Sequence, residues 1–247
     1  INMKKRTRQL KQQAISVAMA GMMAAGSLGS AVTVYAEENA AKWSEETMKD
    51  GWNRVTNEGG KTLGYSPDSG VTLIEQDGYV FKDMNRNGEL DVYEDWRQDA
   101  DSRAEDLVSQ LDADTILPLL FHHTLSEFGT EIGENDKALL DQGLRSAISR
   151  SSAYADKAET AVEWSNNIQK YVESQDYAIP FNLSTDPTYM MNSPTNMALA
   201  STFDPEYVQN FFAEVAKQFR AVGVSTFLGP QCDIASEPRW SRWSGSL

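Results

Sequence analysis

The sequence has a single cysteine, Cys232, and only two histidines, His122 and His123, which are adjacent. One cysteine cannot form an internal disulfide. Cys232 also lies far from the N-terminus, which excludes a lipid-anchored N-terminal cysteine. The histidine pair is a weak metal signal, because neighbouring residues of a strand point to opposite faces. We expect both histidines to pack in the fold or meet solvent.

Basic residues are also few. Lysine and arginine total 22 against 36 aspartates and glutamates, a formal net charge of −14. Five of the basic residues lie within the first 11 positions, so the rest of the chain carries 17 basic and 36 acidic side chains. A surface this acidic repels phosphate backbones and anionic lipids. We therefore expect no nucleic-acid partner, whereas neutral sugars and cations remain possible ligands.

An uncharged run rich in Ala, Gly and Met covers residues 14–34. It follows the basic segment and ends in Val34-Tyr35-Ala36, which places small residues at the key positions of a cleavage site. This order is typical of a secretory signal peptide, so residues 1–36 are interpreted as one. A membrane anchor is the alternative, because the run is nearly long enough to span a bilayer. Its Ala, Gly and Ser content favours cleavage, and we expect a secreted protein without a membrane partner.

The remaining chain divides into a leader segment, residues 37–100, and a second region, residues 101–247. Residues 37–70 are polar and interrupted by Gly59-Gly60, Gly64, Pro67 and Gly70. Little regular structure is expected there. Residues 71–81 alternate enough between apolar and polar to predict a hairpin or strand pair.

The second region shows helical periodicity at residues 103–111, 136–148, 154–173 and 205–222. The last helix is the clearest, with Asp204 as its N-cap, Pro205 at its first position and Gly223 after its end. Residues 116–121 fit either a buried strand or the end of a helical stretch. Strands are expected at 178–183 and 224–228, and one helix between two strands predicts a parallel βαβ unit. An α/β barrel fits this alternation, and a doubly wound sheet fits nearly as well.

Residues 83–94 read DMNRNGELDVYE, which places oxygen ligands at the spacing of a calcium loop. Hard cations such as Ca²⁺ take six to eight oxygens, with a glycine at the sharp turn and a closing bidentate glutamate. The alternative is an Asn-Gly turn with solvated acids. The expected ligands are Asp83, Asn85, Asn87, Glu89 (through its carbonyl), Asp91 and Glu94, and the expected cofactor is a structural Ca²⁺.

Polar side chains also follow the two expected strands of the second region. Asp186 comes after the first strand, and Arg239, Trp240 and Arg242 come after the second. In an α/β barrel, functional residues lie where strands end at the carboxyl face. Carboxylates accept hydroxyl protons and guanidinium groups donate in a fixed fork, so such a set suits a sugar. Composition alone favours the alternative, a loop held by its own salt bridges.

Several segments have a distinctive order and spacing. They are FKDMNRNGELDVYEDWR (81–97), AVEWSNNIQKYVE (161–173), IPFNLSTDP (179–187), NMALASTFDPEYV (196–208), VAKQFRAVGV (215–224) and LGPQCDIASEPRWSR (228–242). Together these segments resemble glycoside hydrolase family 3. The similarity covers about 160 residues, and its most specific part is the last segment.

The resemblance implies a (β/α)₈ TIM-type barrel of which residues 101–247 hold about the first half. It also implies that Asp186 holds sugar hydroxyls, that Arg242 binds sugar beside it, and that Arg239 and Trp240 shape the pocket. Ser241 departs from the family, which usually has glycine there.

Family members hydrolyse terminal β-linked sugars with retention, without a catalytic cofactor. We expect a β-glucosidase-like enzyme acting on an oligosaccharide or glycoside. Its nucleophile and acid/base are expected beyond Leu247, which leaves the chain itself inactive. The alternatives are a β-N-acetylglucosaminidase of the same family and a non-catalytic, calcium-dependent carbohydrate-binding module. The sequence does not indicate the oligomeric state.

Overall fold

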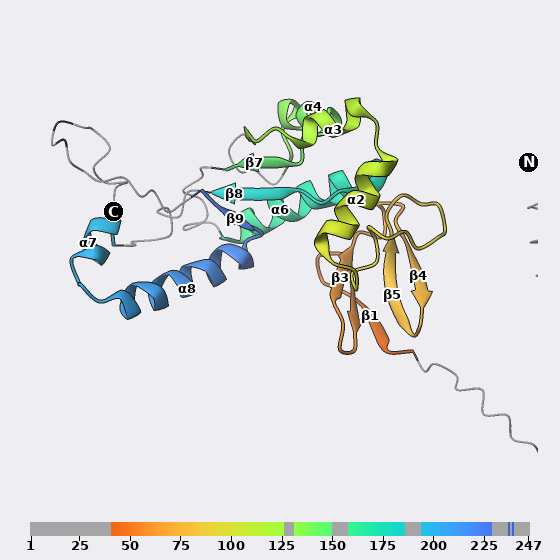
Figure 1. The fold of residues 1–247 in the computed structure, drawn as a ribbon, viewed down its shortest axis with the longest axis horizontal. Coiled ribbons are helices and arrows are strands. Elements are labelled where there is room, and N and C mark those ends of the chain that lie inside the picture. The colour runs from red at the N-terminus through yellow and green to blue at the C-terminus, as the bar shows by residue number, and fades with distance from the viewer. Residues whose placement is uncertain are drawn as a thin grey trace, which may run out of the picture. The chain divides into compact units, whose positions relative to one another are not determined.

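The computed structural model describes residues 41–125, 131–149, 158–185 and 194–228, together with Glu237 and Arg239. All of them fall within one unit of the chain, residues 39–247. They form two small antiparallel sheets followed by a parallel sheet with helices (Figure 1). No helix among these residues is long and apolar enough to cross a membrane.

The leader begins with a three-stranded antiparallel sheet, β1 (Trp43–Thr47), β2 (Asn53–Asn57) and β3 (Thr62–Tyr65). The expectation of little regular structure at residues 37–70 is therefore wrong. Gly59 and Gly60 lie in the turn between β2 and β3, and Gly64 lies within β3, so these glycines do not break the sheet. Gly59 has φ +70°, and a Cβ on Gly60 would lie 2.4 Å from the Trp96 ring, so glycine is needed at this close approach.

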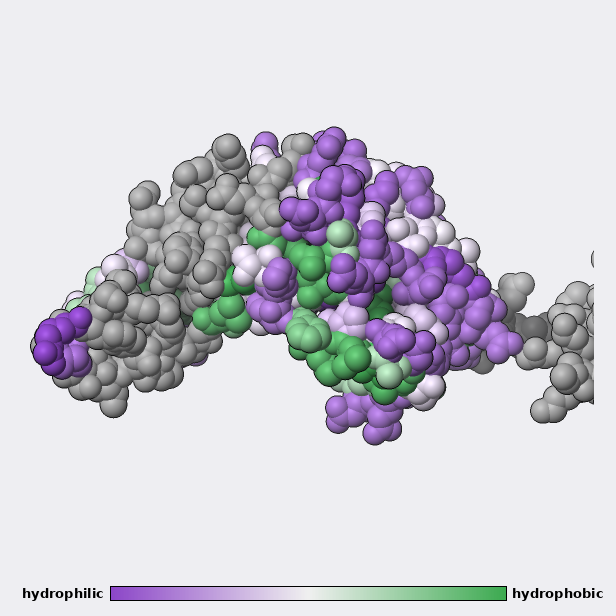
Figure 2. Space-filling view, turned by 90° about the horizontal axis from the view of Figure 1, so that it is seen from above, coloured by the Kyte–Doolittle hydropathy of each residue, from purple (hydrophilic) through white to green (hydrophobic). Residues whose placement is uncertain are grey.

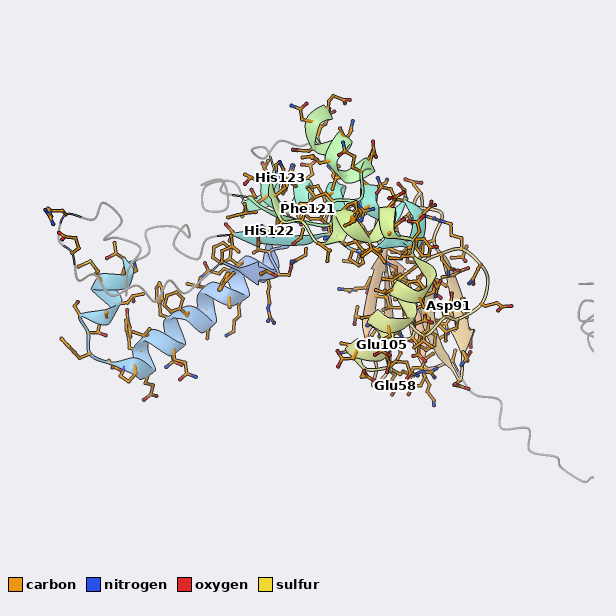
Figure 3. The ribbon with its side chains drawn as sticks, turned by 45° about the horizontal axis from the view of Figure 1, so that its top comes forward. Glu58, Asp91, Glu105, Phe121, His122 and His123 are labelled. Atoms are coloured by element: carbon orange, nitrogen blue, oxygen red, sulfur yellow. The ribbon has the colours of Figure 1, made fainter. Side chains whose placement is uncertain are left out.

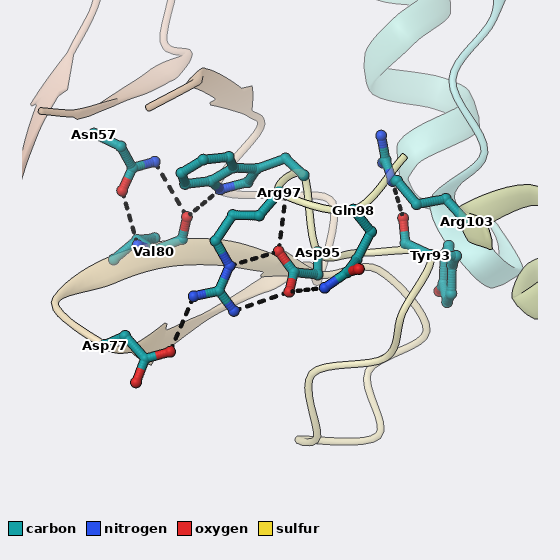
Figure 4. A network of polar contacts seen from close by, with 9 residues as sticks. Asn57, Asp77, Val80, Tyr93, Asp95, Arg97, Gln98 and Arg103 are labelled. Atoms are coloured by element: carbon teal, nitrogen blue, oxygen red, sulfur yellow. Dashed lines mark hydrogen bonds and ion pairs between the residues drawn. The ribbon is translucent and has the colours of Figure 1, made fainter. Parts of the chain in front are cut away.

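The expected hairpin at residues 71–81 is confirmed as β4 (Thr72–Gln76) and β5 (Tyr79–Asp83). Asp77 and Gly78 join the strands with φ of 58° and 80°, which is the geometry of a type I′ hairpin turn. The Asn57 side chain links this hairpin to the first sheet. Val80 N donates to Asn57 Oδ1 at 2.8 Å, and Asn57 Nδ2 donates to the Val80 carbonyl at 3.2 Å (Figure 4).

The second region contains a parallel sheet in the order β6-β7-β8-β9. The expected parallel βαβ unit is confirmed, because α8 connects β8 to the parallel strand β9. The described residues form an open four-stranded sheet and do not close a barrel. The strands are β6 (His123–Thr124), β7 (Ser146–Ile148), β8 (Asn182–Thr185) and β9 (Thr226–Phe227).

Six α-helices are described in this region and just before it. They are α2 (Ala100–Gln110), α3 (Ala113–Leu119), α4 (Glu134–Asp141), α6 (Ala158–Glu173), α7 (Asn196–Ala200) and α8 (Pro205–Ala221), with a short 3₁₀ turn, η2 (Asp176–Ala178), before β8. Asp204 caps α8 as expected, since its side chain accepts from Tyr207 N. Residues 116–121 take the helical alternative up to Leu119.

The expected helix at residues 136–148 is wrong in its second half. The helix ends at Asp141, and residues 146–148 are the strand β7. Gly143 breaks the helical pattern, because it adopts φ +94° and lies against Pro118, where a Cβ would come within 3.1 Å. The strand expected at 178–183 is displaced to Asn182–Thr185, because η2 occupies its beginning.

One face of the parallel sheet carries the hydrophobic core. Ala147 of β7 and Leu183 of β8 are paired and buried, and they cluster with Trp164 and Ile168 of α6 and Phe219 of α8. Side chains alternate across a strand, so the residues beside Ala147 and Leu183 point to the second face. That face carries polar side chains over most of its length.

A buried ion pair joins the leader to α6. Lys82 of β5 donates to Glu173, the last residue of α6, and Glu173 Oε2 accepts from Ser66 N at 2.7 Å. Glu173 is buried and Lys82 largely so. Because a lone buried charge is costly, each of these groups depends on the other.

Candidate functional site

The carboxyl end of the parallel sheet is fixed by buried hydroxyl and backbone bonds. Thr185, the last residue of β8, is fully buried, and its hydroxyl donates to the Ser149 carbonyl at 2.8 Å. Ser149 N donates to Ser184 O at 3.0 Å, and Leu228 N to Thr185 O at 3.0 Å. These bonds set the point at which three neighbouring segments leave the sheet.

Most of the predicted sugar-binding residues lie outside the described residues. These are Asp186, which directly follows Thr185 in the sequence, Trp240 and Arg242, and Cys232 lies outside as well. Arg239 is the one predicted sugar-binding residue that the structure describes.

Arg239 forms a two-pronged ion pair with Glu237. Its Nε and Nη2 each donate to a different carboxylate oxygen of Glu237 at 2.8 Å, and its backbone N donates at 3.0 Å. Hydrogen bonds from Arg239 lower the pKa of Glu237, and the bond to Glu237 raises the pKa of Arg239. Arg239 is exposed, so this pair fits a loop held by its own salt bridge, the alternative that composition favoured.

A polar network on the second face of the parallel sheet was not predicted. We call this the polar face, and it consists of Ser146, Asn182, Ser184 and Thr226. Asn182 Nδ2 donates to Ser146 Oγ at 3.1 Å, and Asn182 Oδ1 accepts from Thr226 Oγ1 at 2.7 Å. Bulky branched side chains usually fill the inside of an α/β barrel. The alternation Phe181-Asn182-Leu183-Ser184 was the signal that sequence reasoning missed.

The two histidines differ in their surroundings, as the strand geometry predicted. His122 Nε2 lies 2.7 Å from Ser184 Oγ on the polar face, whereas His123 pairs in register with Ala147, which faces the helices. Figure 3 places Phe121, His122 and His123 beside one another at this edge of the sheet. Among the described residues, no three His, Cys, Asp or Glu side chains come close enough to hold a metal ion.

An apolar surface lies beside this edge. Phe121 is 65% exposed and Leu120 is 75% exposed, and both follow α3. A hollow of about 350 Å³ is lined by Phe121, His122 and His123, with Leu117 and Leu139. Figure 2 shows hydrophobic surface in the middle of one face of the chain, bordered by hydrophilic residues.

The predicted calcium loop, residues 83–94, folds as a tight turn with its oxygens directed at its own donors. Asp83 Oδ1 accepts from Asn87 N and Asp83 Oδ2 from Gly88 N, both at 3.0 Å. Asp91 Oδ2 accepts from the side-chain amides of Asn85 at 2.6 Å and Asn87 at 2.8 Å. Three of the predicted ligands are therefore in contact around one carboxylate oxygen.

Glu94 closes the loop from its buried position. Its Oε1 accepts from Met84 N at 2.6 Å and Asn85 N at 3.2 Å, and its Oε2 accepts from Asp91 N at 3.1 Å. Burial raises the pKa of Glu94 against the opposing effect of these bonds. Glu89 contributes its backbone N to Asn87 Oδ1 at 2.7 Å. The loop thus brings Asp83, Asn85, Asn87, Asp91 and Glu94 around one turn, but they satisfy each other.

Arg86, within the same loop, fastens it to the end of α6. Its Nη2 donates to the carbonyls of Glu173 at 2.9 Å and Ser69 at 3.0 Å, and its Nη1 donates to that of Gln175 at 3.3 Å. The last carbonyls of a helix lack partners within it and carry partial negative charge. Arg86 therefore caps α6 from outside, a role that the loop pattern did not indicate.

Residues 93–246 match the profile of the glycosyl hydrolase family 3 N terminal domain. The chain belongs to glycosyl hydrolase family 3. The family 3 match begins at residue 93, inside the predicted calcium loop (residues 83–94). It includes the parallel sheet and all four residues predicted to bind sugar. The mixed helices and parallel strands described above are consistent with that domain.

Relatives that are named as glycosidases support the same assignment. A periplasmic beta-glucosidase/beta-xylosidase from Dickeya chrysanthemi is 33% identical over 200 residues, which cover 72% of this chain and 30% of the relative. Beta-glucosidase C from Emericella nidulans is 30% identical over 182 residues, covering 66% of this chain and 29% of the relative. The chain thus spans about 30% of the length of these relatives.

Proposed function

We propose that this chain is the sugar-binding N-terminal part of an exported family 3 glycoside hydrolase. The whole enzyme would release terminal β-linked glucose, or xylose, from an oligosaccharide or glycoside. The observation that carries this proposal is the family 3 match across residues 93–246, together with relatives named for these two activities. The periplasmic relative and the signal-peptide pattern at residues 1–36 support export.

Sugar binding in this proposal depends on side chains at the carboxyl end of the sheet. Asp186 would accept hydroxyl protons, Arg242 would donate to hydroxyl oxygens, and Arg239 with Trp240 would form the pocket wall. The support is positional, because Asp186 follows a strand end that buried bonds of Thr185 hold in place. These residues would line the mouth of a (β/α)₈ barrel, to which β6–β9 would contribute four strands.

We also propose a retaining mechanism. It requires two carboxyl groups about 5–5.5 Å apart, one as nucleophile and one as acid/base. The rest of the enzyme, outside these 247 residues, would supply both groups. The chain expressed alone would then show no turnover of aryl β-glucosides. Turnover that is lost when Asp186 or Glu237 is mutated would contradict this, and would move the chemistry into this chain.

Substitution of Asp186 tests the sugar-binding role. Asp186→Asn in the whole enzyme keeps the size of the side chain and removes its charge. Hydrogen bonds to a charged acceptor are worth about 1.5–3 kcal/mol, so kcat/KM for an aryl β-glucoside should fall at least about tenfold. Asp176→Asn is the matched control, because Asp176 is an exposed aspartate in η2, at the opposite end of β8. Equal kcat/KM for wild type and Asp186→Asn would remove Asp186 from the site.

A second proposal assigns Ca²⁺ to the loop at residues 83–94. The support is the twelve-residue oxygen spacing and the contact of Asn85 and Asn87 with one oxygen of Asp91. A cation would replace the two amide protons there and would favour the ionised form of buried Glu94. Against this stands the geometry itself, in which the described side chains satisfy one another.

Calcium titration of the chain tests the loop. At ten times the dissociation constant, binding to the folded state alone stabilises it by about 1.4 kcal/mol, which should raise Tm. Asp91→Asn should abolish the increase. Glu75→Gln should preserve it, because Glu75 is an exposed acid on the neighbouring strand β4. No change in the Tm of wild type at millimolar calcium would leave the loop as a turn only.

A further inference from the structure

Two hollows meet beside Trp52, where the β1–β2 turn of the leader lies against α6. The larger has a volume of about 680 Å³ and the smaller about 370 Å³, and Trp52 and Asn166 line both. We call the larger hollow the Trp52 groove. It runs along α6 and is closed at one side by the β1–β2 turn of the leader. Its volume lies within the range of small-molecule sites, which often form where two parts of a chain meet.

The floor of the Trp52 groove is apolar. Val162 of α6 is half-buried there, and Val222, which follows α8, is buried. Ala158 and Ala221 add small side chains that leave room above them. Trp52 is half-buried, so the indole is held in place while part of it stays accessible. An aromatic wall over an aliphatic floor offers a flat apolar surface.

The rim of the groove is polar and acidic. Asp50 accepts from Trp52 N at 3.3 Å and from Asn166 Nδ2 at 3.4 Å, which ties the leader turn to α6. Glu159 and Glu163, one helical turn apart, are exposed and also line the groove. No hydrogen bond or ion pair within the described part of the chain engages either carboxylate. They are available as acceptors at the edge of an apolar surface.

We propose that the Trp52 groove binds a neutral oligosaccharide, a proposal that rests on the proposed function for the choice of sugar. A pyranose ring is itself amphipathic, because its C–H groups form an apolar face and its hydroxyls project around the edge. The apolar face would stack on Trp52, and hydroxyls would donate to Glu159 and Glu163. An organic cation would also be attracted to the acids, but the apolar floor of valine and alanine suits a sugar face better.

Titration of the whole chain with two probes tests the groove. The probes are cellotetraose, a neutral β-linked glucan, and spermine, a flexible cation. The measurement is the shift of the tryptophan indole N–H signals in ¹⁵N-labelled protein, together with calorimetry. Cellotetraose should shift the Trp52 signal saturably at millimolar concentration, whereas spermine should not.

Three variants locate the binding. Trp52→Ala should weaken cellotetraose binding at least about tenfold, as expected for loss of an aromatic anchor. Glu163→Gln should weaken it a few-fold. Glu58→Gln is the matched control and should leave it unchanged, because Glu58 is an exposed glutamate of the leader outside the groove (Figure 3). If Trp52→Ala unfolds, Trp52→Phe keeps an aromatic ring and should bind several-fold more weakly than wild type.

Each outcome supports or overturns the proposal. An unshifted Trp52 signal with cellotetraose overturns it, as does cellotetraose binding that Trp52→Ala and Glu163→Gln leave unchanged. Saturable spermine binding that Glu163→Gln abolishes, without cellotetraose binding, makes the groove a cation site instead. Aryl β-glucoside hydrolysis by the whole enzyme is read separately. If the whole wild-type enzyme does not hydrolyse aryl β-glucosides, the proposed function is wrong, but the measured binding of cellotetraose to the groove still stands.

Discussion

The leader and the parallel region are held together by different means. In the described part of the leader, strands adjacent in sequence pair antiparallel, and buried carboxylates accept several hydrogen bonds each. In the parallel region, strands are separated by helices, and the buried side chains on the helix side are mostly apolar. The leader is organised by polar groups over short sequence distances, and the parallel region by a hydrophobic core over long ones.

Asp95 illustrates the polar organisation of the leader. It accepts from Arg97 through Nε and Nη2, both at 2.8 Å, and Arg97 also reaches Asp77 at 3.0 Å (Figure 4). The Arg97 guanidinium lies 4.7 Å from the centre of the Phe81 ring, which stacks on Trp96. A small sheet that lacks a large core thus gains rigidity from fixed charges and stacked rings. The parallel region has a polar network as well, in which Asp141 at the end of α4 accepts from Tyr171 of α6 at 2.6 Å and from Gln175 at 3.0 Å, but this network lies beside an apolar core.

The comparison predicts that loss of volume damages the parallel region most. Trp164→Ala removes a fully buried side chain from the core between α6 and the sheet. Such a cavity costs about 3–5 kcal/mol, so the urea midpoint followed by helical circular dichroism should fall sharply. Leu120→Ala is the control, because Leu120 is 75% exposed and should change stability by less than about 0.5 kcal/mol. Equal effects of the two variants would contradict a core on this face.

An intermediate effect is expected where the two regions meet. Glu173→Gln removes the charge that holds buried Lys82 and weakens the bond from Ser66 N. Loss of a hydrogen-bonded charged group costs about 1.5–3 kcal/mol. Unfolding followed by fluorescence and by circular dichroism should separate into two transitions, because the leader loses its buried ion pair with α6 and keeps only the bonds that Arg86, Asp50 and Asp68 make to that helix. Glu214→Gln, which breaks an exposed pair with Lys217 on α8, should cost less than about 1 kcal/mol and keep one transition.

The smallest effect is expected within the leader, and it depends on pH. Hydrogen bonds from Arg97 lower the pKa of Asp95. A carboxyl whose folded pKa is depressed stabilises the fold above its unfolded pKa of about 3.9, and this contribution is lost as pH falls through the folded pKa. Asp95→Asn should therefore cost about 1 kcal/mol at pH 7 and progressively less in acid.

Asp77→Asn is the companion variant for the pH measurement. Asp77 pairs with the same Arg97 but is largely exposed, so its loss should cost only a few tenths of a kcal/mol at any pH. Thermal unfolding from pH 3 to pH 7 distinguishes the two. A constant difference between wild type and Asp95→Asn across this range would show that Asp95 acts through packing and not through its charge.

Much of the parallel region could be predicted from the sequence. The helix at Pro205–Ala221 carries its own start and stop signals, Asp204 and Gly223, and its strands follow from the helix between them. The leader could not be predicted in the same way. A glycine pair such as Gly59-Gly60 occurs in irregular loops as well as in the turns between strands. The close approach of the Trp96 ring to Gly60 shows why glycine is needed there. A tertiary contact decides between a loop and a turn of a sheet, and a local sequence pattern does not contain that contact.

The site was predictable only in part, for a similar reason. Strand ends and family resemblance predict Asp186, Trp240 and Arg242 as sugar-binding residues. All three lie outside the described residues, so they stay predictions. Arg239 was given a role in the pocket, and the structure pairs it with Glu237 two residues away. The Trp52 groove combines residues more than a hundred positions apart. No motif spans such a distance, so only the fold reveals it.

The Lys82–Glu173 pair has a consequence for how this protein can change over evolutionary time. Neither residue can be lost alone without leaving a mostly buried charge, and the two lie 91 positions apart in the sequence. Related chains should therefore contain both or neither, with an apolar or amide pair as the alternative. Such paired substitution would be visible in aligned sequences as covariation between the last strand of the leader and the end of α6. A chain that loses the leader would also lose Lys82, and Glu173 would have to change at the same time to avoid a buried charge without its partner.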